Sequence, residues 1–291
     1  MKAGEVCRLI NEKGGKGEPF LFAIDFELRE GIFIPRPMEQ EAVLFRTTLG
    51  GNRPLTDGGS GEESRICFTP LPYRDYLSRF NTVMKGLLRG DSYLTNLTVR
   101  TPVTLGTDLK EIFLATRSPY GLYVPGRLAC FSPERFVRIA NGVISTNPMK
   151  GTISAAIPGA AQLLLDDPKE LAEHCTIVDL LRNDIGMVAS DVKVARFRYI
   201  DRITAPAGSV SGAPKRSTVE LIRRAEPELR GFYTGVFGYF DGEEVDSAVI
   251  IRYIGLYDGQ PFYHSGGGIT VNSLPRNEYE EALKKIYLPT R

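Results

Sequence analysis

The sequence of 291 residues lacks the features that mark a membrane, secreted or nucleic-acid-binding protein. No stretch approaches the ~20 uncharged apolar residues that cross a bilayer, and the opening segment MKAGEVCRLINEKGGKGE has no apolar core typical of a secretory signal. Lysine and arginine number 36 against 35 aspartates and glutamates, so a net charge of +1 gives no basic footprint for nucleic acid or an anionic membrane. We therefore expect a cytoplasmic protein with neither kind of partner.

Cysteine and histidine are also scarce, which excludes several kinds of site. The cysteines are Cys7, Cys67, Cys130 and Cys175. They form no CxxC pair, so neither a disulfide framework nor a zinc site is expected. Two histidines, His174 and His264, are too few for a histidine-based metal centre. A GxGxxG fingerprint and a P-loop are absent as well.

Short apolar runs separated by turn residues dominate the chain from Ser92 onward, which is typical of antiparallel strands. One such strand is expected over Ala248–Ile254, a glycine-rich turn over Ser265–Gly268, and a long exposed loop over Gly50–Ser64. Helical spacing is found at Pro72–Leu88, Pro168–Arg182, Lys215–Glu226 and Asn277–Ile286. Runs of strands with helices between them predict an α+β fold with large antiparallel sheets.

Two pairs of glutamates stand three residues apart in predicted helices: Glu170 with Glu173, and Glu278 with Glu281. This spacing places both side chains of a pair on one helical face. Two such helices facing each other would bring together oxygen ligands suited to Mg²⁺. The alternative is that each pair is only a solvated acidic face.

Glycine turns and two cations could bind anions. The segments 149–152, 208–215 and 265–268 could present backbone N–H groups to an anion, or could simply form tight turns. Lys150 would become a nucleophile if desolvated in a pocket, whereas an ordinary surface lysine would not. Arg252 could bind a carboxylate if buried, or stand in water on an edge strand.

Taken together, these segments resemble the chorismate-utilising enzymes. The matching runs are SYLTNLT (92–98), FSPERF (131–136), NPMKGT (147–152), EHCTIVDLLRND (173–184), GSVSGAPK (208–215), RGFYTGVFGY (230–239), VIIR (249–252), GGGI (266–269) and EYEEALKK (278–285). Nine runs in the family's order, from about Tyr73 to Lys285, make coincidence very unlikely. The resemblance implies an α+β fold with large antiparallel β-sheets in a two-layer sandwich and helices on the outside. It also implies one catalytic domain over 1–291, with a short strand-rich segment at about 1–70.

The resemblance implies a role for each matching residue. Glu173 and Glu281 match the family's magnesium ligands, with Glu170 and Glu278 one turn away as outer or water-mediated partners. Glu134 of FSPERF matches the acid that faces the C4 hydroxyl of chorismate, where hydroxide leaves poorly unless protonated. The residues that match the carboxylate-binding and substrate-binding groups are Gly151, Thr152, Ser209, Tyr233, Arg252, Gly267, Gly268 and Lys285.

Lys150 favours one group within the family, the aminodeoxychorismate synthases component I. Its position is alanine in the anthranilate and isochorismate enzymes, whereas in this group the resemblance implies that the lysine attacks C2 of chorismate covalently. Ammonia from a separate glutaminase subunit would then attack C4, giving 4-amino-4-deoxychorismate for para-aminobenzoate and folate synthesis. The strand at Tyr93–Leu97 lacks the lysine base of the isochorismate enzymes, and no LLES run of the tryptophan-regulated anthranilate enzymes occurs. The alternatives are anthranilate synthase component I and a degenerate, non-catalytic member.

One interval departs from the family pattern. Relatives usually carry a further strand and helix before the GSVSGAPK run, where this chain has only Tyr199–Pro206. The motifs on both sides are intact, which a decayed chain would rarely preserve. We therefore predict that a segment is missing from the sequence here and that consecutive Cα atoms between Ile200 and Ala207 lie much further apart than 3.8 Å.

Overall fold

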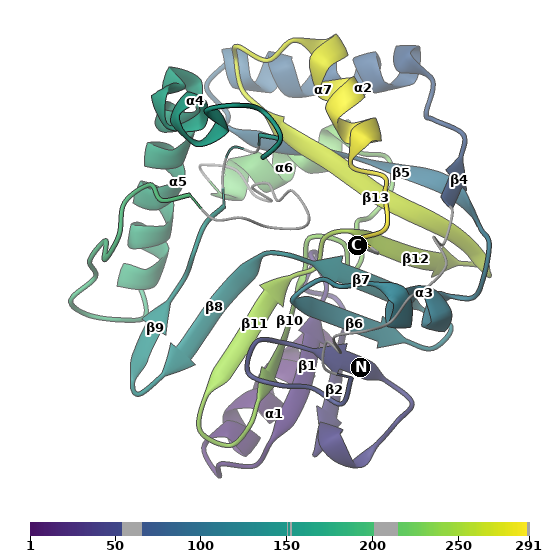
Figure 1. Cartoon of the computed structure of the whole chain (residues 1–291), viewed down its shortest axis with the longest axis vertical. Helices are drawn as coiled ribbons and strands as arrows, with labels where there is room; N and C mark the ends of the chain where they lie inside the picture. Colours follow the sequence, from purple (N-terminus) through teal and green to yellow (C-terminus); the bar gives the residue numbers. More distant parts are fainter. Residues whose placement is uncertain (54–65, 150, 152, 201–214, 290–291) are drawn as a thin grey trace.

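Two antiparallel sheets form the centre of the computed structural model, which describes residues 1–53, 66–149, 151, 153–200 and 215–289 (Figure 1). The first has six strands in the order β2–β1–β10–β11–β8–β9. Its strands are β1 (Phe20–Ile24), β2 (Gly31–Pro35), β8 (Arg135–Ala140), β9 (Val143–Ser145), β10 (Val236–Phe240) and β11 (Val245–Val249). Every pairing in this sheet is antiparallel.

The second sheet has seven strands in the order β3–β6–β7–β12–β13–β5–β4. They are β3 (Leu44–Arg46), β4 (Ile66–Phe68), β5 (Thr95–Leu105), β6 (Tyr120–Val124), β7 (Leu128–Ser132), β12 (Tyr253–Tyr257) and β13 (Gln260–Ile269). One buried cluster joins the sheets, with Leu21 and Phe237 from the first and Leu122 and Tyr253 from the second. The apolar alternation of the strands therefore closes a two-layer sandwich.

Helices lie on the outside of this sandwich, as the sequence predicted. They are α1 (Ala3–Gly14), α2 (Tyr73–Leu88), α3 (Leu109–Ala115), α4 (Ala160–Asp166), α5 (Pro168–Gly186), α6 (Lys215–Ala225), α7 (Pro275–Lys284) and a short 3₁₀ turn, η1 (Pro37–Glu39). The helical spacing of α2 buries Tyr76, Phe80, Val83 and Leu87 in a cluster with side chains of β5, α6 and α7. The predicted α+β fold is confirmed.

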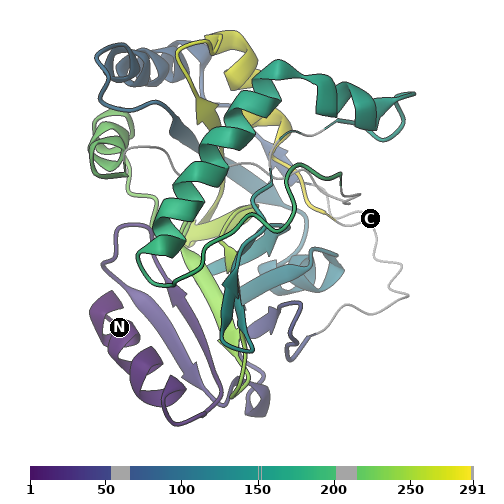
Figure 2. The ribbon, with the colours of Figure 1, turned by 90° about the vertical axis from the view of Figure 1, so that its left-hand side faces the viewer.

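Helices α4 and α5 stand to one side of the seven-stranded sheet and its covering helices (Figures 1 and 2). No residue of α4 is buried, and Ile177 is the one buried position among the described side chains of α5. Their amphipathic faces are therefore held by far fewer apolar contacts than α2 has.

The expected strand over Ala248–Ile254 is wrong in one respect, because two strands share it. β11 ends at Val249 in the six-stranded sheet, and β12 begins at Tyr253 in the seven-stranded sheet. Arg252 lies between them in the left-handed region, at φ 53°. A single strand cannot belong to both layers, so the chain bends at Ile250–Arg252 as it crosses the sandwich.

The expected glycine-rich turn at Ser265–Gly268 is also wrong, because these residues continue β13. Their partners on β5 run from Val99 to Asn96. A Cβ atom at Gly266 would lie only 2.4 Å from the carbonyl oxygen of Leu97. Glycine here therefore permits a close approach of two strands rather than a turn.

Part of what was predicted lies outside the described residues. This applies to most of the loop expected at Gly50–Ser64, and to the interval after Ile200 where a jump in the backbone was expected. Within the described residues, no helix is long and apolar enough to span a membrane.

Candidate active site

One half of the candidate site is built by α7 against β13. Glu278, Glu281 and Lys285 follow one another at spacings of three and four, so they share a face of the helix. A Cβ atom at Gly267 would lie 3.5 Å from a carboxylate oxygen of each glutamate and 3.8 Å from Nζ of Lys285. The absence of a side chain at Gly267 therefore leaves room beside two carboxylates and an ammonium group.

Lys285 is fixed at this place by two contacts. Its ammonium group donates to the carbonyl oxygen of Gly266 at 2.8 Å and pairs with Oε1 of Glu281 at 2.6 Å. The side chain of Lys285 is 15% exposed, whereas that of Glu281 is 53% exposed. The cation is thus held against the sheet, and the glutamate remains open to solvent or ligand.

The two α7 glutamates impose a negative field on their surroundings. Glu278 is buried at 6% exposure, although ionised carboxylates are rarely buried unless they are paired or bind a cation. Burial raises the pKa of Tyr76, and the charges of Glu278 and Glu281 add to that rise. A cation bound between substrate and α7 would relieve this field.

Arg252 and a group of tyrosines lie next to this half. Arg252 is buried, and its Nε donates to the hydroxyl of Tyr287 at 3.1 Å. The main-chain carbonyl of Tyr287 accepts from the hydroxyl of Tyr263 at 3.0 Å. Burial raises the pKa of Tyr233 to about 12, a rise that the nearby charge of Arg252 reduces. Tyr233 therefore stays a neutral hydroxyl group beside a fixed guanidinium.

Glu134 lies at the turn between β7 and β8. Its backbone N–H donates to the hydroxyl of Ser132, and its carbonyl accepts from the N–H of Val249 on the neighbouring strand. The residue is 8% exposed. A carboxyl group that protonates a leaving group must carry the proton when the substrate binds.

The second half of the site comes from α5. A Cβ atom at Gly151 would lie 2.8 Å from Oε2 of Glu170 and 2.7 Å from Leu164, and Gly151 itself is left-handed at φ 66°. The first turn of α5 thus packs on the NPMKGT segment at a position that only glycine fits without strain. Glu173 lies one turn further along the same helix.

A cavity of about 1810 Å³ opens beside this second half, larger than the ~300–1,000 Å³ of ordinary ligand pockets. Its lining includes Asn147, Gly151, Glu170 and His174. Besides them it is lined by β9, α4, α5 and the segment up to Ile200. The α5 glutamate nearest to NPMKGT, Glu170, therefore contributes to the wall of this cavity.

The structure brings some of the predicted site residues together and leaves others apart. Gly267, Glu278, Glu281 and Lys285 form one group, and Gly151 with Glu170 forms another. Gly268 follows Gly267 on β13 and pairs with Asn96 of β5. The predicted residues Lys150, Thr152 and Ser209 lie outside the described residues.

The donors suit magnesium, because all four candidate ligands are carboxylates and Mg²⁺ prefers oxygen. However, in the part of the chain that the structure describes, no three His, Cys, Asp or Glu side chains come close enough to hold a metal ion. A site with Glu173 and Glu281 as its two direct ligands needs no such group of three, so magnesium there remains a prediction.

Tyr287 is a site residue that the sequence analysis missed. It holds Arg252 through its hydroxyl and stands two residues beyond Lys285. No local pattern marks it, because its partner comes from the bend between β11 and β12.

The sequence profile of the chorismate binding enzymes matches residues 38–205 and 202–291. This chain belongs to the chorismate binding enzyme family. The two matched parts overlap at 202–205, inside the interval where a segment was expected to be missing.

Similar proteins in this family carry several names. The "Uncharacterized PabA-like protein" of Haemophilus influenzae is 40% identical over 311 aligned positions, covering 96% of this chain and 94% of that protein. The "Aminodeoxychorismate synthase component 1" of Salmonella typhimurium is 34% identical over 73% of this chain and 56% of that protein. The chain thus spans little more than half the length of this named synthase.

Solved structures support the fold. The putative 2,3-dihydroxybenzoate-specific isochorismate synthase DhbC of Bacillus anthracis superimposes with a TM-score of 0.71 at 19% identity, over 97% of this chain and 85% of that one. Anthranilate synthase component I of Streptococcus pneumoniae gives a TM-score of 0.62 at 28% identity, over 79% and 60%. The predicted family and its fold are confirmed.

Proposed function

We propose that this chain is the component of an aminodeoxychorismate synthase that aminates chorismate at C4. The geometry that supports this is the room beside Gly267, where Lys285 and the α7 glutamates meet. A lysine against the sheet suits a substrate carboxylate, and the acidic pair suits a bound cation. The observation that selects amination within the family is the lysine at position 150.

In the proposed reaction, Lys150 acts first as the nucleophile and Glu134 then acts as the acid. The amine of Lys150 attacks C2 of chorismate, the ring double bonds shift, and the C4–O bond breaks as Glu134 protonates the departing hydroxyl group to water. Ammonia then attacks C4, the double bonds shift back, and the C2–N bond breaks. Lys150 leaves as the free amine, and the ammonium group formed at C4 returns a proton to Glu134. Overall one ammonia is consumed and one water is released.

Other residues hold the substrate. Arg252 and Lys285 would bind its two carboxylates, with the backbone of Gly267 and Gly268 alongside and Gly151, Thr152, Ser209 and Tyr233 completing the contacts. Magnesium held by Glu173 and Glu281, with Glu170 and Glu278 as outer partners, would neutralise one ring carboxylate. The ammonia would come from a glutaminase subunit in the cytoplasm.

Anthranilate synthase component I is the second candidate. It is favoured by relatives of that name, one of which, from Acetivibrio thermocellus, is 34% identical over 67% of this chain. In that reaction the amine enters at C2 and pyruvate leaves, so the products differ from those of C4 amination. A chain that binds chorismate without converting it is the third possibility.

The test is incubation of the whole protein with chorismate, Mg²⁺ and ammonium, followed by product analysis. Aminodeoxychorismate is the expected product, and Lys150→Ala should abolish it while chorismate still binds. Intact mass spectrometry without ammonia should find an adduct on the peptide that carries Lys150. Anthranilate and pyruvate would indicate the second candidate, and no product would indicate the third.

A further inference from the structure

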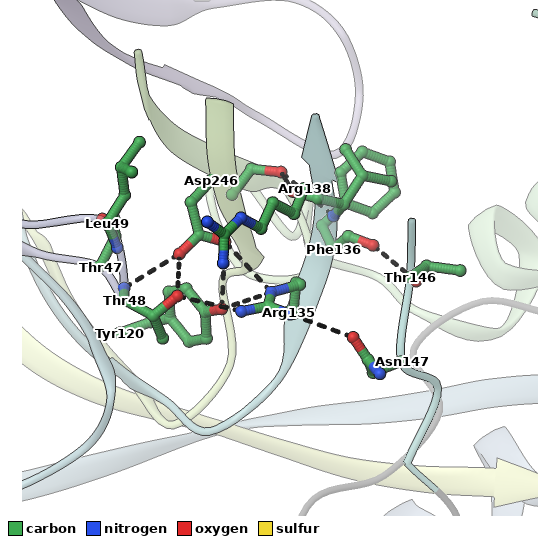
Figure 3. Close-up of polar contacts among 12 residues, drawn as sticks. Thr47, Thr48, Leu49, Tyr120, Arg135, Phe136, Arg138, Thr146, Asn147 and Asp246 are labelled. Carbon is green, nitrogen blue, oxygen red and sulfur yellow. Dashed lines mark hydrogen bonds and ion pairs between the residues drawn. The ribbon is translucent and has the colours of Figure 1, made fainter. Parts of the chain in front are cut away.

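The guanidinium of Arg135 joins four segments that are apart in the sequence (Figure 3). Its Nε donates to the hydroxyl of Tyr120 at 2.8 Å and to Oδ1 of Asp246 at 3.2 Å. Its Nη2 donates to the hydroxyl of Thr48 at 3.0 Å, and its Nη1 donates to Oδ1 of Asn147 at 3.1 Å. All three nitrogens of one planar group are therefore engaged.

The Asp246 side of this network is a fixed anchor. Asp246 is fully buried, and its Oδ2 accepts from the backbone N–H and the hydroxyl of Thr48 at 2.9 and 2.5 Å. Its Oδ1 also accepts from the hydroxyl of Tyr120 at 3.1 Å. A buried carboxylate held by a cation and three further donors has little freedom to move, so Arg135 is held at a defined angle.

A strand irregularity places Arg135 where it can reach this anchor. The register between β8 and β11 shifts between the pairs Asp246–Arg138 and Ala248–Arg135. The hydroxyl of Ser247 bridges the shift, accepting from the N–H of Val137 and donating to its carbonyl. Such bulges re-aim side chains and are enriched beside active sites.

The opposite side of the guanidinium holds a different motif. Asn147 opens the NPMKGT run just after β9, and its amide donates onward to the hydroxyl of Tyr199 at 3.0 Å. Arg135 itself follows Glu134 directly in the FSPERF run. One side chain thus connects the turn that bears the proposed acid to the start of the segment that bears the proposed nucleophile.

We infer that Arg135 is a positioning residue, which fixes the FSPERF turn and the NPMKGT segment in one relative arrangement through Asn147. This inference rests on the proposed function, since Glu134 and the NPMKGT segment are its reacting parts. A lysine at 135 could still pair with Asp246, but it lacks the planar fork that reaches Asn147 at the same time.

The experiment compares Arg135→Lys and Asn147→Ala with Arg138→Lys as the matched control. Arg138 is on the same strand, and its guanidinium pairs at 2.7 Å with Glu244, which lies in the turn between β10 and β11. We expect each of the first two variants to lower kcat for C4 amination about tenfold or more, with KM for chorismate nearly unchanged, because misplaced reacting groups cost rate rather than binding. The double variant should be no slower than the worse single one, since both remove the same contact.

A second readout does not depend on turnover. Amide hydrogen exchange over residues 143–149 should rise several-fold in Arg135→Lys and Asn147→Ala, and should stay at the wild-type rate in Arg138→Lys. An inactive wild type would refute the proposed function, and exchange would then decide the inference alone. Four results would each overturn the inference about Arg135. They are a wild-type kcat in Asn147→Ala, an effect confined to KM, losses that multiply in the double variant, and unchanged hydrogen exchange.

Discussion

His264 should make the folded protein sensitive to mild acid. It lies on β13 at 3% exposure, with its Nε2 3.1 Å from the hydroxyl of Tyr257 and its ring 5.1 Å from that of Tyr233. Burial, together with the positive charges of Arg100 and Arg230, lowers the pKa of His264 to about 3. The imidazole is therefore neutral in the folded state at every pH at which the protein would be studied.

The magnitude follows from the difference between the folded and unfolded states. A histidine in the unfolded chain has a pKa near 6.5, so as pH falls the unfolded chain takes up the proton first. The stability contributed by neutral burial is therefore present above about pH 6.5 and is lost as pH falls toward about 3. The slope approaches ~1.4 kcal/mol per pH unit, which gives a loss of about 2 kcal/mol between pH 7 and pH 5.

The assay is urea unfolding of the wild type and of His264→Gln at pH 7 and pH 5. Glutamine cannot titrate but can still bond to Tyr257, so the variant should lose about 2 kcal/mol less than the wild type over this interval. The control is His174→Gln, which removes the other of the two histidines and should keep the full wild-type loss. Parallel losses in the wild type and His264→Gln would refute the reasoning.

Four further substitutions separate folding from function. Gly266→Ala should destabilise the fold, because its Cβ would meet the backbone of the neighbouring strand at 2.4 Å. Gly267→Ala has only contacts of 3.5 Å or more, so it should fold normally yet lose activity. Equal melting temperatures for the two variants would contradict this. Glu226→Gln should cost about 3 kcal/mol in urea unfolding, because Arg230, 2.6 Å away and fully buried, would lose its counter-charge; a stability equal to wild type would count against it. Glu281→Gln should lower the amination rate ~10²-fold at low magnesium, and full activity there would show that the assignment of this ligand is wrong.

Much of the fold could be predicted because its signals are local. The spacing of Tyr76, Phe80, Val83 and Leu87 predicted α2, and the burial of these side chains confirms it. The crossing at Arg252 could not be predicted, because an apolar run gives no sign of which sheet each of its halves will join. Helix α1 was not predicted either: it buries only Ala3 and Val6, too few apolar positions for a clear period.

Part of the candidate site could likewise be predicted from the sequence, and part of it could not. Glu278, Glu281 and Lys285 could be grouped from the sequence, since one helix carries all three at helical spacings. Their meeting with Gly267 depends on how α7 packs on β13, which only the tertiary structure gives. The network of Arg135 was missed for the same reason: Thr48, Tyr120 and Asp246 come from strands and loops that no short pattern connects.

The half of the site on α5 and the half on α7 also differ in how far they depend on the interval after Ile200, where a segment was expected to be missing. The alignment with the Haemophilus protein needs 311 positions for 96% of a chain of 291 residues, so that relative carries about 30 positions that this chain lacks. The family match breaks at 202–205, and the segment leading up to it exposes Met187, Val188 and Phe197 at 75%, 74% and 48%.

Large exposed apolar patches can mark a surface against which other groups pack. The α5 half lines the same cavity as Val188 of this segment, whereas the other half lies where α7 packs on β13 and α2. A family member that lacks residues in this interval would therefore lose the contribution of Glu170 and Glu173 to the site first. If Lys285 binds a carboxylate of chorismate as proposed, such a member would still bind chorismate, so binding without magnesium-dependent turnover would separate a degenerate member from an active synthase.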